Sequence, residues 1–338
     1  MVGYSYNYGV SSGMGAENWD FSSDGLTYNN LGSGLEAAKE GKTMMSSYKN
    51  DHKLISFFGR VNYDWKERYL FTFSLRHEGS SRFGENHKWG NFPAVSVGWR
   101  ISDEKFMKGF SWIDDLKVRY DYGVTGNQEI GNYKSLAQLK SKNYIYNDAL
   151  MQGFYETIGN PDLKWERTKQ FDLGFDLSLW NRIHLNVDYY SRRTSDLLYD
   201  VPIPSTSGFS TMLSNIGIVS NKGVEIGLNT VNVSKKDFTW KTNLTFSLNR
   251  NKIVDLYGDK KDDLANRWFI GQPMKVIYDL EKVGIWQTED KELAAKYGQV
   301  PGHIRVADLD ENYVIDERDY KVLGSPSPDW TAGMTNTF

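Results

Sequence analysis

Residues 168–199 read TKQFDLGFDLSLWNRIHLNVDYYSRRTSDLLY, and this stretch decides the fold. From Phe171 to Leu179 every second residue is apolar, and the residues between them are polar or glycine. After the two-residue link Trp180-Asn181, the alternation resumes from Ile183 to Tyr189. Strict alternation is typical of a β-strand with one dry and one wet face, because successive side chains leave a strand on opposite sides. The stretch predicts a tight hairpin whose arms can reach the ~9–11 residues that cross a bilayer at a tilt.

The same pattern repeats along the rest of the chain. Tyr4, Tyr6 and Tyr8 alternate like the end of a strand, and a loop rich in Gly, Ser and Asn is expected from Ser11 to about Asp51. The final run, from Trp330 to Phe338, resembles a strand that is cut off partway. Further strands are predicted around residues 55–63, 69–76, 95–101, 116–122, 224–228 and 238–248. We therefore expect roughly ten strands in all.

Composition narrows the class of protein. The chain has 338 residues and a net charge of −3, without a basic run, which argues against a nucleic-acid binder. It has no cysteine, so disulfides and thiolate metal sites are excluded. The chain has 21 tyrosines and 11 tryptophans, and these two residue types are enriched in membrane-interface belts and carbohydrate sites. A mean hydropathy of −0.57 is compatible with a membrane barrel, whose strands are only half apolar.

The connections between the predicted strands alternate in length. Short or moderate connections follow Asp64, Ser102, Leu179 and Val233, and long ones follow Arg76, Val124, Tyr199 and Asn249. In an antiparallel sheet this places all short turns at one rim, with Trp65, Trp180 and Lys235-Lys236, and all long loops at the other. Outer-membrane barrels have this asymmetry, with short periplasmic turns and long external loops.

These patterns favour an all-β fold, namely part of an antiparallel up-and-down transmembrane β-barrel. In this interpretation the polar phase faces the lumen and the apolar phase faces outward. The residues expected on the lumen side are Asp172, Asp176, Asn186 and Asp188, and those expected to face outward are Leu173, Phe175, Leu185 and Val187. The alternative is a soluble or surface-attached β-sandwich, stabilised by calcium, that binds glycans and packs its apolar phase against a second sheet.

Several motifs resemble those of one family in order along nearly the whole chain. They are FGRVNY (58–63), RHEGSSRF (76–83), NFPAVSVGWRISDE (91–104), YGVTGNQ (122–128), NPDLKWE (160–166), NKGVE (221–225) and LGSPSPD (323–329). As a set they resemble consecutive barrel strands of the SusC/RagA-type TonB-dependent outer-membrane transporters. The resemblance implies transport of oligosaccharides or peptides across the outer membrane, without enzyme chemistry.

The resemblance also implies parts that this sequence does not match. The family is expected to have a barrel of about 22 strands, a plug, a segment that contacts the TonB complex, and a SusD-like lipoprotein over the external loops. Residues 1–338 are expected to form a partial barrel domain that lacks the plug and the last strands, with a loop insertion at 288–323. The N-terminus does not resemble a signal peptide, so we expect an internal piece of a longer exported chain. An open sheet leaves exposed edges in lipid, so this piece alone is not expected to transport.

An acidic loop near the C-terminus has the spacing of a calcium site. Oxygen ligands are expected from Asp308, Asp310, Asn312, the carbonyl of Val314, Asp316 and Asp319, at positions 1, 3, 5, 7, 9 and 12 of the loop. Tyr313 replaces the usual glycine at position 6, so a distorted site of modest affinity is expected. Ile315 is expected to pack inward, and the loop to lead directly into the strand at Trp330. The alternative is a solvated acidic turn, and a short helix is expected after Thr288, ending near Gly298.

Aromatic side chains in the predicted loops are candidate cargo contacts, because flat rings stack on sugar rings. The candidates are Trp89, Tyr144, Tyr146, Phe154 and Tyr155. Anchoring at the membrane interface, or loop packing, explains the same residues without a ligand.

No catalytic site is expected. Asp172, Asp176 and Asp188 lie in the polar phase of long strands, where carboxylates are ordinary. The five histidines lack the spacing of metal ligands. A group of cations in the polar phase is expected either to form a basic lumen wall or to be solvated: Arg76, Arg100, Lys117 and Arg119.

Overall fold

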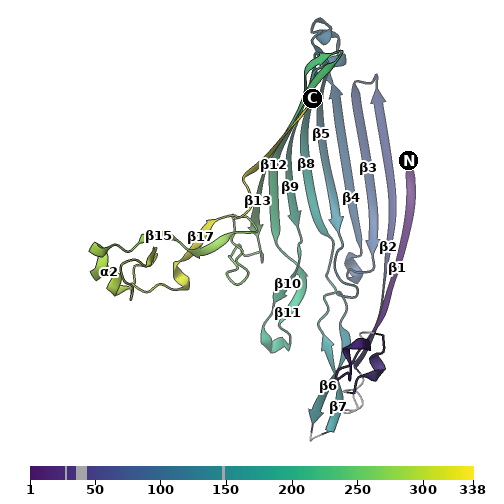
Figure 1. Cartoon of the computed structure of the whole chain (residues 1–338). Coiled ribbons are helices and arrows are strands. Elements are labelled where there is room, and N and C mark those ends of the chain that lie inside the picture. The colour runs from purple at the N-terminus through teal and green to yellow at the C-terminus, as the bar shows by residue number, and fades with distance from the viewer. Residues whose placement is uncertain (27–28, 36–43, 147–148) are drawn as a thin grey trace.

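The computed structural model describes residues 1–26, 29–35, 44–146 and 149–338. At its centre is one ten-stranded sheet, and every strand is antiparallel to its neighbours (Figure 1). In order, the strands are β1 (Val2–Glu17), β2 (Met44–Trp65), β3 (Tyr69–Ser80), β4 (Trp89–Arg100), β5 (Ile113–Asn127), β8 (Glu166–Leu179), β9 (Ile183–Ser195), β12 (Ile218–Lys235), β13 (Phe238–Asp255) and β18 (Trp330–Thr337). The predicted antiparallel order along the chain is confirmed.

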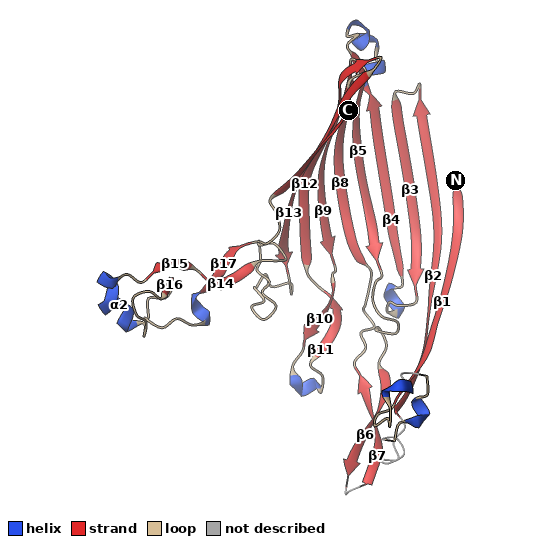
Figure 2. Cartoon of the chain, in the orientation of Figure 1, coloured by secondary structure: helices blue, strands red, loops and turns tan. Residues whose placement is uncertain are grey.

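The sandwich alternative does not occur in the described residues. The other sheets there have two strands each, and all of them lie within the long loops (Figure 2). They are β6–β7 (Gln138–Tyr146 and Ala149–Thr157), β10–β11 (Leu198–Pro202 and Thr211–Asn215), β14–β17 (Ile277–Leu280 and Tyr320–Gly324) and β15–β16 (Lys282–Ile285 and Ile304–Val306). Among the described residues, each helix is too short or too polar to cross a bilayer.

The hairpin of β8 and β9 has the register that its alternation predicts. Phe175 lies opposite Val187, and Asp176 lies opposite Asn186. Trp180 and Asn181, which form the turn, have φ angles of 51° and 52°. Positive φ at both central residues matches the right-handed twist of the two strands.

Short and long connections lie at opposite ends of the sheet (Figure 1). The short-turn rim carries the turns that follow Trp65, Leu179 and Lys235, and also the link of 3-10 turns from Ile101 to Gly109. The loop rim carries the two-stranded sheets and the arm, which we define as residues 277–324. The arm projects away from the sheet and ends in the helix α2 (Lys291–Lys296).

Several predicted loop limits were wrong. β1 continues to Glu17 and β2 begins at Met44, so much of the expected 11–51 loop is paired strand. The long connection expected after Val124 contains β6 and β7. These segments lack clean alternation, but backbone pairing does not require it: Gly13, for example, lies opposite Tyr48 in the register.

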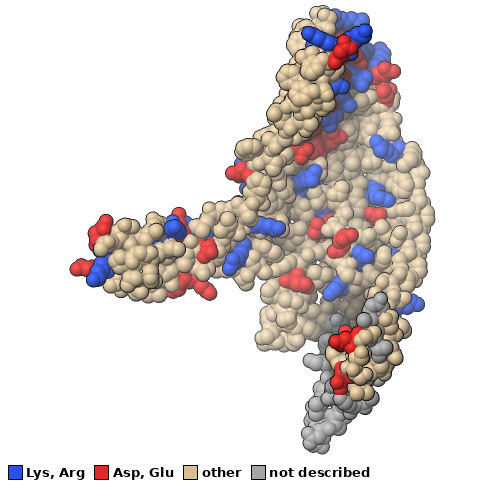
Figure 3. All heavy atoms as spheres, in the orientation of Figure 1, with Lys and Arg blue, Asp and Glu red and all other residues tan. Residues whose placement is uncertain are grey.

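The two faces of the sheet differ in chemistry. One face carries apolar side chains that no other described part of the chain covers: Phe73 is 41% exposed and Leu173 is 45% exposed. The other carries polar and charged side chains, and Figure 3 shows Lys, Arg, Asp and Glu scattered over the face of the sheet that is turned towards the viewer. A sheet with one exposed apolar face and one polar face is typical of a membrane barrel wall.

The most enclosed hydrophobic cluster lies at the loop rim. Phe83, Phe92, Leu163 and Trp165 are all buried there. They come from β4 and from two loops, so this cluster holds loops against the sheet.

Candidate functional site

An ion-pair cluster occupies the middle of the polar face. Arg119 of β5 pairs with Asp176 of β8, with Nε 2.7 Å from Oδ2, and with Asp188 of β9, with Nη2 2.9 Å from Oδ1. The side chain of Arg119 reaches β9 because Gly174 lies between them: a Cβ there would stand 2.6 Å from Cζ of Arg119. Asp176 and Asp188 are thus engaged by one guanidinium group.

The expected basic wall is a wall of mixed charge. Nε of Arg76 lies 3.5 Å from the Glu78 carboxylate, and Nε of Arg100 lies 3.5 Å from the Asp115 carboxylate. Carboxylates on the same and neighbouring strands share the phase of the cations and pair with them.

Towards β18, the polar face carries amides and hydroxyls. Asn243 of β13 donates a hydrogen bond of 2.6 Å to Asn229 of β12. Tyr190 of β9 reaches over Gly223 of β12 and donates to Asn249 of β13 at 3.0 Å. Like the contact between Arg119 and Asp188, the contact between Tyr190 and Asn249 joins two strands that are not neighbours, here β9 and β13.

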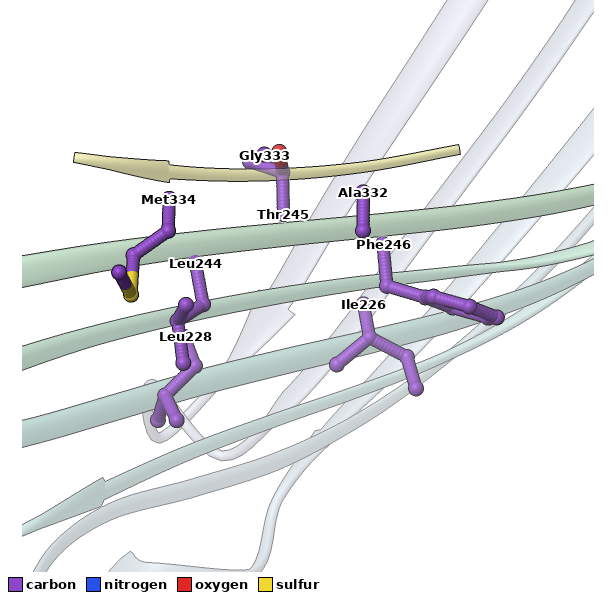
Figure 4. A pocket seen from close by; sticks show the side chains of 8 residues that line it. All are labelled: Ile226, Leu228, Leu244, Thr245, Phe246, Ala332, Gly333 and Met334. Carbon is purple, nitrogen blue, oxygen red and sulfur yellow. The ribbon is translucent and has the colours of Figure 1, made fainter. Parts of the chain in front are cut away.

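The apolar face has an open hollow of about 400 Å³ over β12, β13 and β18. In Figure 4, Leu244, Phe246 and Met334 leave the sheet on one side, whereas Thr245 leaves on the other. The figure also places Ile226, Leu228 and Ala332 with the apolar group. The hollow belongs to the apolar face, so lipid chains can fill it.

Aromatic side chains gather at the short-turn rim. Exposed members are Trp65, Tyr69, Trp99, Trp112, Trp180 and Phe238. Rings with one dry end and one wet end favour this position in a membrane protein. The rings of Trp112 and Trp180 stack with centroids 5.8 Å apart.

Glu104 ties part of this rim together from the turn after β4. Its carboxylate accepts hydrogen bonds from the Tyr69 hydroxyl at 2.6 Å, from Trp99 Nε1 at 3.2 Å and from Arg68 Nη1 at 2.9 Å. The Tyr69 hydrogen bond, together with those of Trp99 and Arg68, outweighs desolvation and lowers the pKa of Glu104. The carboxylate therefore stays ionised and holds two rings of the rim in place.

The predicted cargo aromatics are not all described. The backbones of Tyr144, Tyr146, Phe154 and Tyr155 lie in β6 and β7, and their side chains lie outside the described residues. Trp89 stacks on His77 with centroids 4.7 Å apart. It has the strand phase of Val95 and Val97, on the apolar face, so its position is that of an interface anchor.

Three loops meet around Trp165, which is 2% exposed. The centroid of its ring lies 4.9 Å from that of Phe83 and 5.1 Å from that of Phe92. Its Nε1 donates to the carbonyl of Lys88 at 2.9 Å. The loop after β3 is thereby fixed to the segment that precedes β8.

Two asparagines extend this junction to the β10–β11 loop. The Asn160 amide donates to the carbonyl of Leu213 at 2.8 Å. The Asn215 amide donates to the carbonyls of Lys164 at 2.7 Å and Asp196 at 2.9 Å. The NPDLKWE motif thus connects the external loops.

The acidic loop brings together some of its predicted ligands. Carboxylate oxygens of Asp308, Asp310 and Asp319 lie within 4.8 Å of one another, and Asp319 is fully buried. Tyr313 has a φ of 64°, so it adopts the left-handed conformation that glycine usually supplies. Carboxylate oxygens are the ligands that calcium prefers, and each of the three carboxylates also accepts hydrogen bonds from donors within the loop.

Other predicted ligands are engaged within the loop. Asp316 accepts from Arg318 Nη2 at 2.8 Å, and Asn312 Oδ1 accepts from the N–H of Val314 at 2.6 Å. Desolvation opposes ionisation of Asp308, but donors that include the Tyr313 N–H outweigh it and lower the pKa of Asp308. The side chain of Ile315 is half-buried.

The surroundings of the loop differ from expectation in two places. The loop leads into β17, at Tyr320, and not directly into the strand at Trp330, because β17 pairs with β14 in the arm. The predicted helix is present as a 3-10 turn from Thr288 to Asp290 followed by α2. Its N-cap is Gln287, whose backbone N–H donates to Asp290.

Comparisons with known proteins agree with this architecture. The family described as "TonB dependent receptor-like, beta-barrel" matches residues 2–333. The TonB-dependent receptor P3 of Formosa agariphila is 37% identical over 99% of this chain and 34% of its own length. The TonB-dependent receptor SusC of Bacteroides thetaiotaomicron is 34% identical over 86% of this chain and 30% of its own length.

The chain belongs to the TonB-dependent receptors. A structure of the RagAB peptide importer in its closed-closed state matches 98% of this receptor chain and 36% of the importer chain, with a TM-score of 0.79 and 31% identity. The receptor chain spans about a third of the length of these relatives. Its SusC/RagA-type resemblance is confirmed, and it is an outer-membrane β-barrel segment.

Sequence reasoning missed the contacts between strands that are not neighbours. Arg119 and Asp188 are separated by β8, and Tyr190 and Asn249 are separated by β12. The sequence does contain a signal for these contacts. In each case the intervening strand has a glycine in its polar phase, Gly174 on β8 and Gly223 on β12. In this receptor such a glycine marks a place where a long side chain crosses.

Proposed function

We propose that this chain forms part of the wall of a SusC-like, TonB-dependent transporter that imports oligosaccharides or peptides. The observation that carries the proposal is the opposite chemistry of the two sheet faces, combined with the segregation of short turns and long loops to opposite rims. A wall of this kind separates lipid from an aqueous lumen. The matched family consists of transporters and not enzymes, and this proposal assigns no catalytic residue.

We further propose a SusD-like lipoprotein and the TonB complex as partners of the whole protein. Support comes from the likeness to SusC and to the RagAB importer. The loops tied together around Trp165 offer a firm external surface for such a lipoprotein.

Growth of cells that carry the full-length gene tests the transport proposal. Cells are supplied with neutral oligosaccharides or with peptides as the limiting nutrient. We expect that growth on one of these nutrients needs both the receptor and TonB. Growth that is unchanged after deletion of the receptor on every nutrient contradicts the proposal.

Calcium binding by the acidic loop is also a proposal. Asp308, Asp310 and Asp319 supply the ligands, because their oxygens converge. Like charges held this close repel one another unless a cation or donors lie between them. The ion stabilises the tip of the arm and takes no part in chemistry.

A further inference from the structure

Near the short-turn rim, polar side chains lie on the apolar face of β12, β13 and β18. Thr242 of β13 lies opposite Thr230 of β12 on one side and opposite Asn336 of β18 on the other. The next residue of the same phase on β13 is Leu244, whose side chain leaves the sheet on the apolar side (Figure 4). Successive residues of one phase share a face, so these three polar residues face the lipid. Polar groups in such a place are costly unless they find hydrogen-bond partners.

A β-bulge brings a fourth polar side chain to the same place. The register of β12 against β13 shifts between Val231 and Val233, so Asn232 is an extra residue without an opposite partner. Its Nδ2 donates to Thr242 Oγ1 at 2.6 Å, which places its side chain on the apolar face. Bulges commonly re-aim a side chain in this way. The bulge therefore adds an amide to a face that is otherwise expected to meet hydrocarbon.

These groups form a chain of hydrogen bonds that ends on Asn336. Thr230 donates to Asn232 Oδ1 at 2.8 Å, and Asn232 donates in turn to Thr242. Asn336 Oδ1 accepts from Thr242 Oγ1 at 2.7 Å and from Trp240 Nε1 at 3.0 Å. An indole N–H can only donate, so it fixes which end of the Asn336 amide is the oxygen. The NH2 group of Asn336 donates to no partner within the described part of the chain, and it faces the lipid with both protons.

The open hollow of the apolar face begins directly beyond this hydrogen-bonded chain. Leu244 and Met334, which line the hollow, are each two residues further from the short-turn rim than the polar residues of their strands. Further along β18, Ala332 lies opposite Phe246, and its single methyl group leaves the space above it open. The hollow measures about 400 Å³. The unused NH2 group thus lies at the end of the hollow that is nearer to the short-turn rim.

Two cations lie on the other side of the hydrogen-bonded chain, at the rim itself. Lys235, the last residue of β12, lies opposite Phe238, which has the strand phase of Trp240. Its side chain therefore starts from the apolar face, and a lysine in this position can extend to the level of the headgroups. Lys236 follows in the turn. Within the described residues, neither ammonium group pairs with a carboxylate.

We propose that this part of the apolar face binds one phospholipid of the periplasmic leaflet. Lys235 and Lys236 face the phosphate, the NH2 group of Asn336 donates to an ester carbonyl, and one acyl chain fills the hollow. The order of these three parts from the rim inwards is the order of phosphate, ester and acyl chain in the lipid. Short turns of outer-membrane barrels are periplasmic, which selects the phospholipid leaflet. We call this site the lipid groove, and it depends on the outer-membrane family of the chain and not on the cargo.

Native mass spectrometry of the purified full-length receptor tests the inference, because it counts bound lipids one by one. The probes are phosphatidylethanolamine and the diacylglycerol with the same acyl chains. We expect the first phosphatidylethanolamine to bind about tenfold more tightly than later ones and than diacylglycerol. In Asn336→Leu this first affinity is expected to fall about tenfold, since one hydrogen bond is lost. The matched control is Thr335→Val, which changes the neighbouring residue on the polar face of β18 and retains the affinity.

Two further variants leave the hydrogen-bonded chain intact. Ala332→Phe fills the hollow and is expected to remove the tightly bound lipid. Its control, Val97→Phe, enlarges an exposed side chain on the apolar face of β4 and retains that lipid. The double variant Lys235→Gln, Lys236→Gln is expected to bind phosphatidylethanolamine no better than diacylglycerol, because it lacks the cations for the phosphate.

Several results overturn the inference. One is a statistical series of bound lipids in the wild type, with no first lipid held more tightly than the others. Others are a wild-type first affinity in Asn336→Leu or in Ala332→Phe, an equal loss in either control, and an undiminished preference for phosphatidylethanolamine in the double lysine variant. Tighter binding of lipid A than of phosphatidylethanolamine contradicts the assignment to the periplasmic leaflet. Competition by glycerophosphoethanolamine, which has no acyl chain, shows that the hollow takes no part.

Discussion

Arg119 on β5 donates a hydrogen bond of 2.9 Å to Asp188 on β9, although β8 lies between the two strands. Backbone hydrogen bonds join only adjacent strands, so this side-chain contact adds a link that the ladder cannot make. Gly174 makes the contact possible because it has no side chain to fill the path.

Replacement of Gly174 by alanine tests that link. A Cβ at this position stands 2.6 Å from both Arg119 Cζ and Asp188 Oδ1, so the guanidinium must move aside. We expect a loss of about 1 kcal/mol in the free energy of unfolding, since the pair is partly exposed to solvent. Urea unfolding of the full-length protein from lipid vesicles measures it. Gly59→Ala is the control, because a Cβ there meets nothing within 4 Å; equal losses in both variants would contradict the role of Gly174.

Spin labels test the assignment of the two faces. A label at Phe175 is expected to be accessible to oxygen dissolved in lipid, and a label at Asp176 to a water-soluble relaxant. The reason is that adjacent residues of β8 point to opposite sides of the sheet. Inverted accessibilities in the membrane-inserted full-length protein would reverse the lumen and lipid faces.

Trp165→Ala is expected to loosen the external loops. The indole is buried against Phe83 and Phe92 and bonds the Lys88 carbonyl, so its removal costs about 3–5 kcal/mol locally. Faster proteolysis of the loops on intact cells measures the effect. Trp180→Ala, an exposed ring at the opposite rim, is expected to leave loop proteolysis unchanged. Unaltered cleavage in Trp165→Ala would show that the junction is held elsewhere.

Calorimetry with calcium separates the carboxylates of the acidic loop. Wild-type protein is expected to give a binding heat of modest affinity, and Asp310→Ala to abolish it. Asp316→Ala serves as the comparison and is expected to retain the heat, because Asp316 lies outside the converging group, although Arg318 pairs with both Asp310 and Asp316. Absence of heat in the wild type, or the same heat in Asp310→Ala, would leave only a solvated acidic turn.

Acid is expected to loosen the same loop in the absence of calcium. The pKa of Asp308 is lowered in the folded protein, so its contribution to stability is fully present above the ordinary value of about 3.9. That contribution is lost as the pH falls through the lowered pKa. Hydrogen exchange of the backbone amides of the arm, measured between pH 2 and 7 with most points near pH ~3.9, follows the change. In Asp308→Asn this part of the pH dependence should disappear; its persistence would assign the titration to another group.

The ladder of strands was predictable because its signal is local. Phe171 and Asp172 already carry opposite chemistry at adjacent positions, and the turn at Trp180-Asn181 sets the register. Strand ends were less predictable, since residues such as Gly13 gain their order from a partner strand. The sequence around such a residue does not indicate which strand it pairs with.

The candidate sites were predictable only where the contacts are close in sequence. The acidic loop gathers Asp308 and Asp310 as expected, but Arg318, two residues from Asp316, takes that carboxylate away. Tyr313 adopts the left-handed conformation despite its side chain, which single-residue preferences disfavour.

The turn between β8 and β9 has a backbone conformation that costs free energy, and this cost is linked to the position of the sheet in the bilayer. Trp180 holds a φ of 51°, where an L-residue loses about 1–2 kcal/mol relative to ordinary backbone. Glycine would relieve that cost, but it would also remove the ring that stacks on Trp112. We expect the Trp180 ring to lie among the lipid headgroups and to anchor this end of the sheet there. The strained backbone of the turn is then the cost of that anchor.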